Sequence, residues 1–379
     1  MVEVHADPLS ALRRRTSEKW VEYPSDVLPL FVAEMDYPLA PVVAAAITER
    51  IALSDTGYVA SALPVGEAFA GFASRRWGWD VDPASVRTTT DVSVCIVESL
   101  RRVIRPRDGV VINPPVYPPF FHLVPEAGGT VVEVPLLDDG TEYSLDLDGI
   151  EAAFAAGARA LLLCNPQNPV GLVHSVSSLV AVAELAAKYD ATVVSDEIHS
   201  LLTHSTASFT PFLSVSDAAR EHGIAVTSAS KAFNLAGVKC AIMVTASDRS
   251  LAHLDAMSVE VGWRTSILGL HATVAALTTG DDWLDGTVAA IEESKRLLGE
   301  MLSAELPGVV FRPPDATYLA WLDFRALDWG DDPSIRALER RVALNPGPDF
   351  GGQGCGFARL NFACSPEILT EAIHRLAAP

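Results

Sequence analysis

The stretch ALLLCNPQNPVGLVHSVSSLVAVAELAAKYDATVVSDEIH, from Ala160 to His199, decides the fold. It begins with a short, uninterrupted apolar run and continues through the loop NPQNPVG. A helical pattern follows, with Ser175 as its candidate N-cap, and ATVVSDE then forms a second β-rich run. Two strands separated by a helical crossover indicate a parallel sheet that is covered by helices on both faces.

The sequence on either side of this stretch continues the alternation of strands and helices. GVVINPP (109–115), GTVVEVP (129–135) and IAVTS (224–228) predict three more strands. Because they are separated by helical patterns, they extend the same mostly parallel sheet. The fold class is therefore predicted to be α/β.

The last hundred or so residues have a different character. A helical pattern leads into GVVF, TYLAWLDF and FARLNFA, which predict the strands of a second, smaller sheet. We expect three parts: an N-terminal segment (1–39) that packs on the small domain, a large domain (40–270), and a small α+β C-terminal domain (271–379).

The charge balance bears on the partners of the protein. The chain has 379 residues, of which 28 are basic and 48 acidic, giving a formal net charge of −20. Its 49% hydrophobic and 20% charged residues are typical of a globular protein. Nucleic acids and anionic membranes attract clustered Lys and Arg, so the balance argues against both partners. The one basic cluster, Arg13–Arg15, is interpreted as a solvated helix face.

The cysteines and the N-terminus bear on the compartment. Five cysteines without CxxC spacing argue against a disulfide framework or a metal site, and we interpret all five as small buried residues. The reducing cytoplasm is the expected setting. The beginning MVEVHADPLSALRRR lacks the order of a signal peptide, and prolines interrupt the longest uncharged run, so we expect no membrane span.

Polar residues gather where the predicted strands end. Asn165–Gly171 follows the first strand of the opening stretch, Asp196–His199 the second, and Ser228–Lys231 the strand IAVTS. Taken singly, such residues have structural explanations: a helix cap for the aspartate, a satisfied core histidine, a turn for an Asn-Pro pair. Ligands of open parallel sheets bind at the carboxyl ends of the strands, so their joint occurrence predicts one site.

An amine, a buried acid and hydroxyl groups together suit pyridoxal phosphate (PLP). Its aldehyde forms a Schiff base with a lysine, and its ring nitrogen needs an acid partner to stay protonated. Its phosphate needs backbone N–H groups, hydroxyls and a cation. The sequence therefore predicts a PLP site with Lys231 at its centre.

The sequence resembles the fold-type I PLP enzymes of the aminotransferase class I/II superfamily. More narrowly, it is similar to the MalY/PatB-type cystathionine (cysteine-S-conjugate) β-lyases. The resemblance covers nearly the whole chain, and NPQNPVG is typical of the superfamily. SDEIH together with SASKAFNLAG is specific for the narrower branch, as is the segment VAEMDYP. It implies a large domain with a mostly parallel sheet and a smaller α+β domain.

The resemblance assigns roles to the strand-end residues. Lys231 would be the Schiff-base lysine and would move the proton at the substrate's α-carbon. Asp196 would pair with the pyridine nitrogen, and Asn168 would bond the ring's 3-oxygen. His199 would lie nearby, and Tyr117, otherwise a core aromatic, would stack on the ring face.

The resemblance also implies a phosphate site. Its members would be the hydroxyls of Ser228 and Ser230, the backbone N–H groups of Val92 and Ser93, the charge of Lys239, and Tyr58 of the neighbouring subunit. A tyrosine shared in this way implies a homodimer. Lys239 stands where aminotransferases usually carry arginine, and it would neutralise phosphate as a point charge.

Asp91 is a second departure, because relatives often have glycine before the phosphate-binding helix. Its carboxylate would repel a phosphate unless it points away and caps the helix. The loop GPDFGGQGCGF does not spell GxGxxG and leads into a strand instead. That strand carries Arg359, which by resemblance would bind the substrate's α-carboxylate as a fork, with Asn168 beside it.

The implied activity is β-elimination from an S-substituted L-cysteine, giving pyruvate, ammonia and a thiol. An aminotransferase shares every step through removal of the α-proton, and the fold does not separate the two. A regulator that keeps the PLP fold is a third possibility. The segments VAEMDYP and SDEIH favour the lyase, and intact Lys231, Asp196 and Arg359 argue against loss of chemistry.

Overall fold

The computed structural model describes residues 2–378. Its main element is a seven-stranded sheet in the order β2-β10-β9-β8-β7-β3-β4. Only β10 runs antiparallel to its neighbours, so the expected mostly parallel α/β fold is confirmed. The strands are β2 Val86–Thr89, β3 Gly109–Ile112, β4 Thr130–Glu133, β7 Ala160–Cys164, β8 Thr192–Asp196, β9 Gly223–Thr227 and β10 Ala241–Val244.

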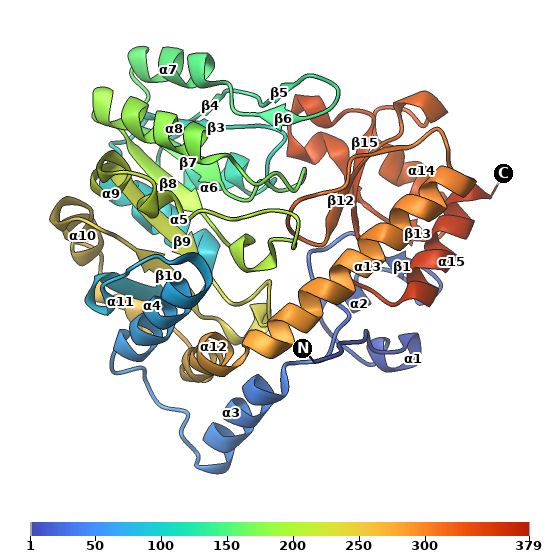
Figure 1. Cartoon of the computed structure of the whole chain (residues 1–379), viewed down its shortest axis with the longest axis horizontal. Coiled ribbons are helices and arrows are strands. Elements are labelled where there is room, and N and C mark those ends of the chain that lie inside the picture. The colour runs from blue at the N-terminus through green and yellow to red at the C-terminus, as the bar shows by residue number, and fades with distance from the viewer. Residues whose placement is uncertain (1, 379) are drawn as a thin grey trace.

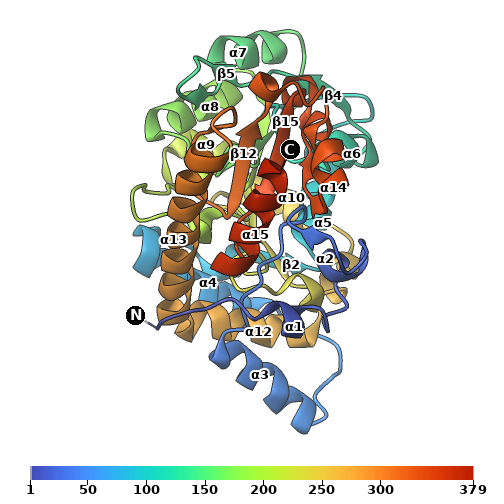
Figure 2. The same ribbon diagram turned by 90° about the vertical axis from the view of Figure 1, so that its right-hand side faces the viewer.

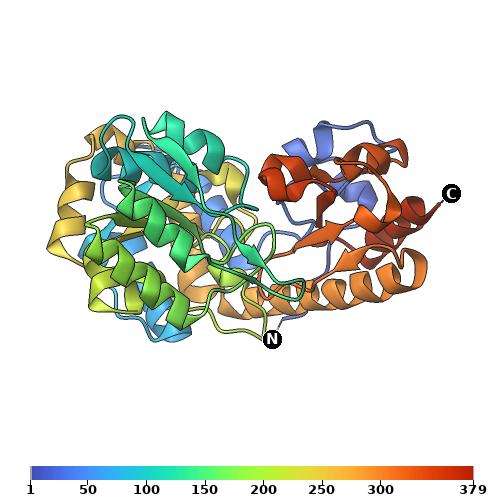
Figure 3. The ribbon, with the colours of Figure 1, turned by 90° about the horizontal axis from the view of Figure 1, so that it is seen from above.

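Helices cover both faces of this sheet (Figures 1 and 3). Alternate residues of β7 enter different cores: Leu161 and Leu163 pack with α7 and α8, whereas Leu162 packs with α5 and α6. This two-sided burial explains why the strand is apolar without interruption. The helices on the first face are α7 Leu147–Ala155, α8 Val176–Lys188 and α9 Asp217–His222; those on the second are α5 Val92–Val103, α6 Phe120–Glu126 and α10 Asp248–Asp255.

A smaller antiparallel sheet lies beside the large one, in the order β11-β12-β15-β14. Helix α13, Asp281–Glu305, runs along both parts (Figures 1 and 3). The strands are β11 Val310–Phe311, β12 Leu319–Asp323, β14 Asn345–Pro346 and β15 Phe357–Asn361, and the helices are α14 Pro333–Glu339 and α15 Pro366–Ala377. The domain limits given above stay a prediction.

The N-terminal segment lies against the C-terminal part of the chain (Figure 2). β1 (Leu28–Pro29) pairs in parallel with β13 (Val342–Ala343), and the backbone N–H of Leu30 continues this pairing. The remaining elements are α1 Leu9–Leu12, α2 Glu18–Val21, α3 Pro41–Ala52, α4 Leu63–Trp77, α11 Val259–Trp263, α12 Ile267–Thr279, β5 Leu137–Asp138 and β6 Tyr143–Ser144.

The structure corrects two minor interpretations. Arg13–Arg15 follows α1 instead of lying on it, and Arg15 is half-buried because its guanidinium donates to Asp7 and to the carbonyls of Met35 and Tyr37. Cys355 is exposed, whereas the other four cysteines are buried as expected. Within residues 2–378, no helix has the length and apolar character needed to cross a membrane.

Candidate active site

A cavity of about 400 Å³ lies at the carboxyl ends of the central strands. The loops after β7 and β9 bring Asn168 and Lys231 to it, and the last residue of β8 is Asp196. It is also lined by Tyr117, His199, Ser228, Ser230, Val92, Ser93 and Lys239. The sequence-predicted residues therefore converge, with two exceptions: Arg359 lies directly behind Asn168, and Tyr58 is 90% exposed elsewhere on the surface.

Lys231 faces the interior of the cavity. Its Nζ donates to the carbonyl oxygen of Ala33 at 2.9 Å. Burial lowers the pKa of Lys231 to about 8 and the positive charge of Arg359 acts in the same direction, although nearby carboxylates such as Glu34 oppose the shift. The amine therefore gives up its proton far more readily than an exposed lysine does, as a nucleophile or base requires.

Asp196 and His199 form the floor of the cavity. Burial raises the pKa of Asp196 to about 7, and no cationic side chain among residues 2–378 lies within ion-pair distance of its carboxylate. Burial lowers the pKa of His199 to about 3, so the ring is neutral. Its Nδ1 has no hydrogen-bond partner in the described part of the chain. Within the described chain, the floor of the cavity thus contains a carboxyl group without an ion-pair partner and an imidazole nitrogen without a hydrogen-bond partner.

Arg359 is buried on β15 and reaches toward Asn168. Its Nη1 donates to Asn168 Oδ1 at 3.1 Å and its Nη2 to the carbonyl of Phe31 at 2.9 Å. The guanidinium also lies 5.0 Å from the ring centroid of Phe350. Because the amide oxygen of Asn168 accepts from Arg359, the Nδ2 group of Asn168 is oriented to donate elsewhere.

The first turn of α5 forms one corner of the cavity, where the sequence predicts the phosphate site. Asp91 is the N-cap of this helix and accepts from the backbone N–H of Val94 at 3.2 Å, so the carboxylate caps as the sequence allowed. Its other oxygen lies 3.7 Å from Lys239 Nζ. The N–H groups of Val92 and Ser93 are in the helical turn whose donors lack intrahelical acceptors.

The Ser228 hydroxyl of this corner already makes two hydrogen bonds. The Ser228 hydroxyl donates to the carbonyl of Cys240 at 2.7 Å and accepts from the backbone N–H of Ser230 at 3.1 Å. Donation from Ser228 to an anion therefore requires the hydroxyl to rotate. The anion site predicted from the sequence stays a prediction. Its members other than Tyr58 lie together in one cavity, whereas Tyr58 is exposed elsewhere on the surface.

Sequence reasoning missed the fourth side of the cavity, which we call the N-terminal wall and define as residues 31–37. Its contacts with Lys231, Tyr318 and Asn361 are made by backbone carbonyls. The carbonyl of Ala33 accepts from Lys231 and from the Tyr318 hydroxyl at 3.0 Å, and Asn361 Nδ2 donates to the carbonyls of Val32 and Glu34. Because every residue has a backbone carbonyl, no side-chain pattern in the sequence predicts which carbonyls will accept these bonds.

Asn234 and Lys19 also fix the N-terminal wall. Asn234, three residues after Lys231, bonds both the N–H and the carbonyl of Met35. Lys19 Nζ donates to Asp36 Oδ1 at 2.7 Å and to the carbonyl of Glu34 at 3.0 Å. Both side chains of the Lys19–Asp36 pair are fully buried. The segment VAEMDYP was the one sequence signal for this wall, and it was interpreted only as a motif of the lyase branch.

Comparisons with known proteins agree with this geometry. The sequence pattern of aminotransferase class I and II matches residues 25–376. The chain belongs to this family. A cystathionine β-lyase of Corynebacterium glutamicum is 37% identical over 97% of this chain and 98% of its own length. The cystathionine β-lyase PatB of Bacillus subtilis is 34% identical over 93% and 92%, respectively. The expected resemblance to the MalY/PatB branch is confirmed.

The solved structures extend the agreement to three dimensions. Cystalysin of Treponema denticola, whose structure contains pyridoxal 5'-phosphate, superposes with a TM-score of 0.92 at 26% identity. The match covers 100% of this chain and 98% of cystalysin. The fold expected from the sequence, that of fold-type I PLP enzymes, is therefore confirmed over the whole described chain.

Proposed function

We propose that this chain is a PLP-dependent carbon–sulfur β-lyase. It acts on an S-substituted L-cysteine of the cystathionine type and forms pyruvate, ammonia and a thiol. The observation that carries the proposal is the meeting of a buried lysine of lowered pKa with a buried aspartate that lacks a cation, in one cavity. Relatives named cystathionine β-lyase support the choice of reaction.

The donor set of the cavity fits PLP. Asp196 lacks a positive partner, which a protonated pyridine nitrogen supplies, and Asn168 Nδ2 is oriented to donate to the 3-oxygen. Tyr117 covers one side, and neutral His199 offers its unpartnered Nδ1. The corner of α5 would hold the phosphate through its N–H groups, the serine hydroxyls and Lys239. When bound, PLP supplies an electron sink for the charge that remains after α-proton removal.

The reaction uses three polar side chains of the site. Arg359, with Asn168, holds the α-carboxylate through paired N–H donors and fixes the orientation of the α-carbon. Lys231 Nζ takes the α-proton, and its position is set by the carbonyl of Ala33. The Cβ–S bond breaks with its electron pair on sulfur, which leaves as a thiolate and is protonated. The released 2-aminoacrylate reacts with water to give pyruvate and ammonia.

An aminotransferase is the second candidate function, because the matched family is named for that activity. It differs after α-proton removal, when the proton returns to the cofactor and a 2-oxo acid is needed to finish the cycle. A regulator that keeps the PLP fold is the third. The complete set of Lys231, Asp196 and Arg359 supports a working enzyme over that alternative.

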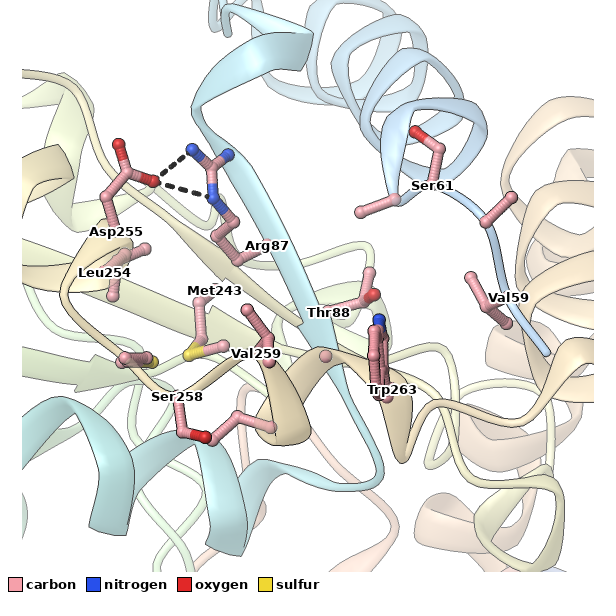
Figure 4. Close-up of a pocket in the computed structure, with 15 residues that line it drawn as sticks. Val59, Ser61, Arg87, Thr88, Met243, Leu254, Asp255, Ser258, Val259 and Trp263 are labelled. Atoms are coloured by element: carbon pink, nitrogen blue, oxygen red, sulfur yellow. Dashed lines mark hydrogen bonds and ion pairs between the residues drawn. The ribbon is translucent and has the colours of Figure 1, made fainter.

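We propose a homodimer with shared active sites as the working form. Tyr58 is 90% exposed and is followed in the chain by Val59. A cavity of about 260 Å³ adjoins this segment and is lined by Val59 and Ser61 on one side and by Val259 and Trp263 of α11 (Figure 4). Exposed Val259 and Trp263 support a surface that a second copy covers. The five cysteines, none of which is in a disulfide, support a cytoplasmic enzyme.

Product analysis tests the proposed reaction. The holoenzyme is given L-cystathionine with and without a 2-oxo acid, and pyruvate, ammonia and the released thiol are measured. We expect the three products in equal amounts without any 2-oxo acid, because the thiolate carries the electron pair away. Turnover that occurs only with a 2-oxo acid and yields no pyruvate would identify the aminotransferase instead.

A further inference from the structure

Two carboxylates at the active-site cavity have no part in the proposed chemistry. Glu18 begins α2 and is exposed, and Glu34 belongs to the N-terminal wall and is half-buried. Both line the same cavity as Lys231. Ser17 donates its hydroxyl to Glu34 Oε1 at 2.6 Å, which fixes the carboxylate and leaves its second oxygen available.

The other charged groups of the cavity either make contacts of their own or have a part in the proposed chemistry. Asp91 caps α5 and faces Lys239, and Asp196 lies on the floor at the end of β8. Lys231 donates to the carbonyl of Ala33 and not to either glutamate. Glu18 and Glu34 have no ion-pair partner within residues 2–378. Two carboxylates without a cation therefore border the space beside the reactive amine.

The position of the N-terminal wall relates these carboxylates to the substrate. The carbonyl of Phe31 accepts from the guanidinium of Arg359, the proposed binding group for the substrate's α-carboxylate. The carbonyl of Ala33 accepts from Lys231, the proposed base at the α-carbon. Glu34 is the next residue along the wall, and Glu18 joins it on the same cavity. A group carried by the substrate beyond its sulfur enters the electric field of both carboxylates.

We infer that Glu18 and Glu34 are specificity-determining residues that favour a positively charged group on the sulfur side of the substrate. The inference rests on the proposed lyase function and deepens it by naming the class of leaving group. An ammonium two or three bonds beyond sulfur gains attraction from both carboxylates, a neutral alkyl group gains none, and a carboxylate is repelled. A cystathionine-like substrate carries both an ammonium and a carboxylate on its distal carbon, so for that substrate the two effects oppose each other.

The experiment compares three substrates of similar length on the holoenzyme. They are S-(2-aminoethyl)-L-cysteine, S-propyl-L-cysteine and S-(2-carboxyethyl)-L-cysteine, which differ in the charge at the distal end. kcat/KM is measured from pyruvate formation for each. We expect the order cationic, neutral, anionic, and a cationic-to-neutral ratio that falls when ionic strength rises from about 0.01 M to about 1 M, where the Debye length shrinks from about 30 Å to about 3 Å.

Substitution assigns the preference to the two residues. Glu34→Gln keeps a side chain that can accept from Ser17, and we expect it to lower the cationic-to-neutral ratio about tenfold, equal to about 1.4 kcal/mol. Glu18→Gln lowers the ratio less, because Glu18 is exposed. Glu221→Gln, at an exposed position near the end of α9, removes the same charge just before the amino end of β9, opposite the strand end that borders the cavity, and leaves the ratio as it is.

The outcomes separate the inference from the proposed function. A ratio of two kcat/KM values from one sample is independent of the fraction of folded enzyme, so impaired folding does not obscure the result. In one outcome, S-propyl-L-cysteine gives pyruvate while the cationic-to-neutral ratio of the double variant Glu18→Gln/Glu34→Gln stays within about twofold of the wild-type ratio. In that case the inference is wrong and the proposed lyase function is unaffected. If the wild-type enzyme gives pyruvate from none of the three, the proposed function itself fails.

Discussion

Two sides of one cavity are built from different materials. At the strand ends, the side chains of Asn168, Asp196 and Lys231 supply an amide, an acid and an amine on a rigid parallel sheet. The N-terminal wall supplies backbone carbonyls, held in place by donors from α2, from the loop after β9 and from the small sheet. The comparison shows that the strand ends supply the reactive side chains. The N-terminal wall, which has little regular structure, positions them.

Lys231→Ala has the largest expected effect, because it removes the one amine that the strand ends contribute. We expect pyruvate formation to fall at least about a thousandfold, since general base catalysis alone contributes about 10²–10⁴. The fold should persist, because the lysine makes a single hydrogen bond to the wall. Pyruvate assays and far-ultraviolet circular dichroism measure the two effects.

Lys188→Ala is the matched control for that substitution. Lys188 pairs with Glu151 at the exposed end of α8, just before the amino end of β8, whereas the cavity lies at the carboxyl ends of the strands. The control should keep the wild-type rate. A Lys231→Ala enzyme that releases pyruvate at a rate close to wild type would remove the lysine from the mechanism.

Lys19→Met tests the other side of the comparison. The substitution leaves the carboxylate of Asp36 buried without a partner, and breaking a buried pair costs about 3–5 kcal/mol. We expect the free energy of unfolding in urea to fall by that order. We also expect a lower kcat, because the carbonyl of Glu34 loses a donor and the wall that positions Lys231 loosens.

The double variant Lys19→Met/Asp36→Leu sharpens this result. Replacing both partners of a buried ion pair with apolar residues is often neutral, so stability should recover while the wall still lacks the donor to Glu34. Lys188→Met, which breaks an exposed pair, should change stability far less. If Lys19→Met unfolds at the same urea concentration as Lys188→Met, the pair does not hold the wall.

The strand-end side could be predicted from the sequence, and the physical reason is periodicity. An uninterrupted apolar run such as Ala160–Cys164 signals a strand buried on both faces, and the residues after it must lie at the ligand-binding edge. Ser175 was predicted as the cap of α8 from its place before the helical pattern. In the structure its hydroxyl accepts from the backbone N–H of Ser178, three residues later. Local rules were sufficient where the structure is local.

The N-terminal wall could not be predicted in the same way. Its bonds join residues about 200 to 330 positions apart, such as Lys231 with Ala33 and Asn361 with Val32. The carbonyl acceptors have no side-chain signature, and the pairing of Lys19 with Asp36 has no helical or strand spacing. Glu18 and Glu34 were therefore missed as well, because only the folded chain brings them to the cavity.

Tyr58 belongs to neither side of the cavity within one chain, and its substitution has the smallest expected effect. The residue is 90% exposed, so Tyr58→Phe removes no internal bond and should leave the free energy of unfolding of the protomer unchanged. If the hydroxyl reaches the phosphate of a second copy, its loss removes one hydrogen bond to a charged group, which is worth about 1.5–3 kcal/mol. We expect the dissociation constant of PLP to rise about 10- to 100-fold in a dimer that sediments like the wild type. The measurement is equilibrium binding of PLP to the apoenzyme, with sedimentation velocity on the same samples. A wild-type protein that sediments as a fully active monomer would show that each chain completes its own site and that the exposed tyrosine serves another purpose.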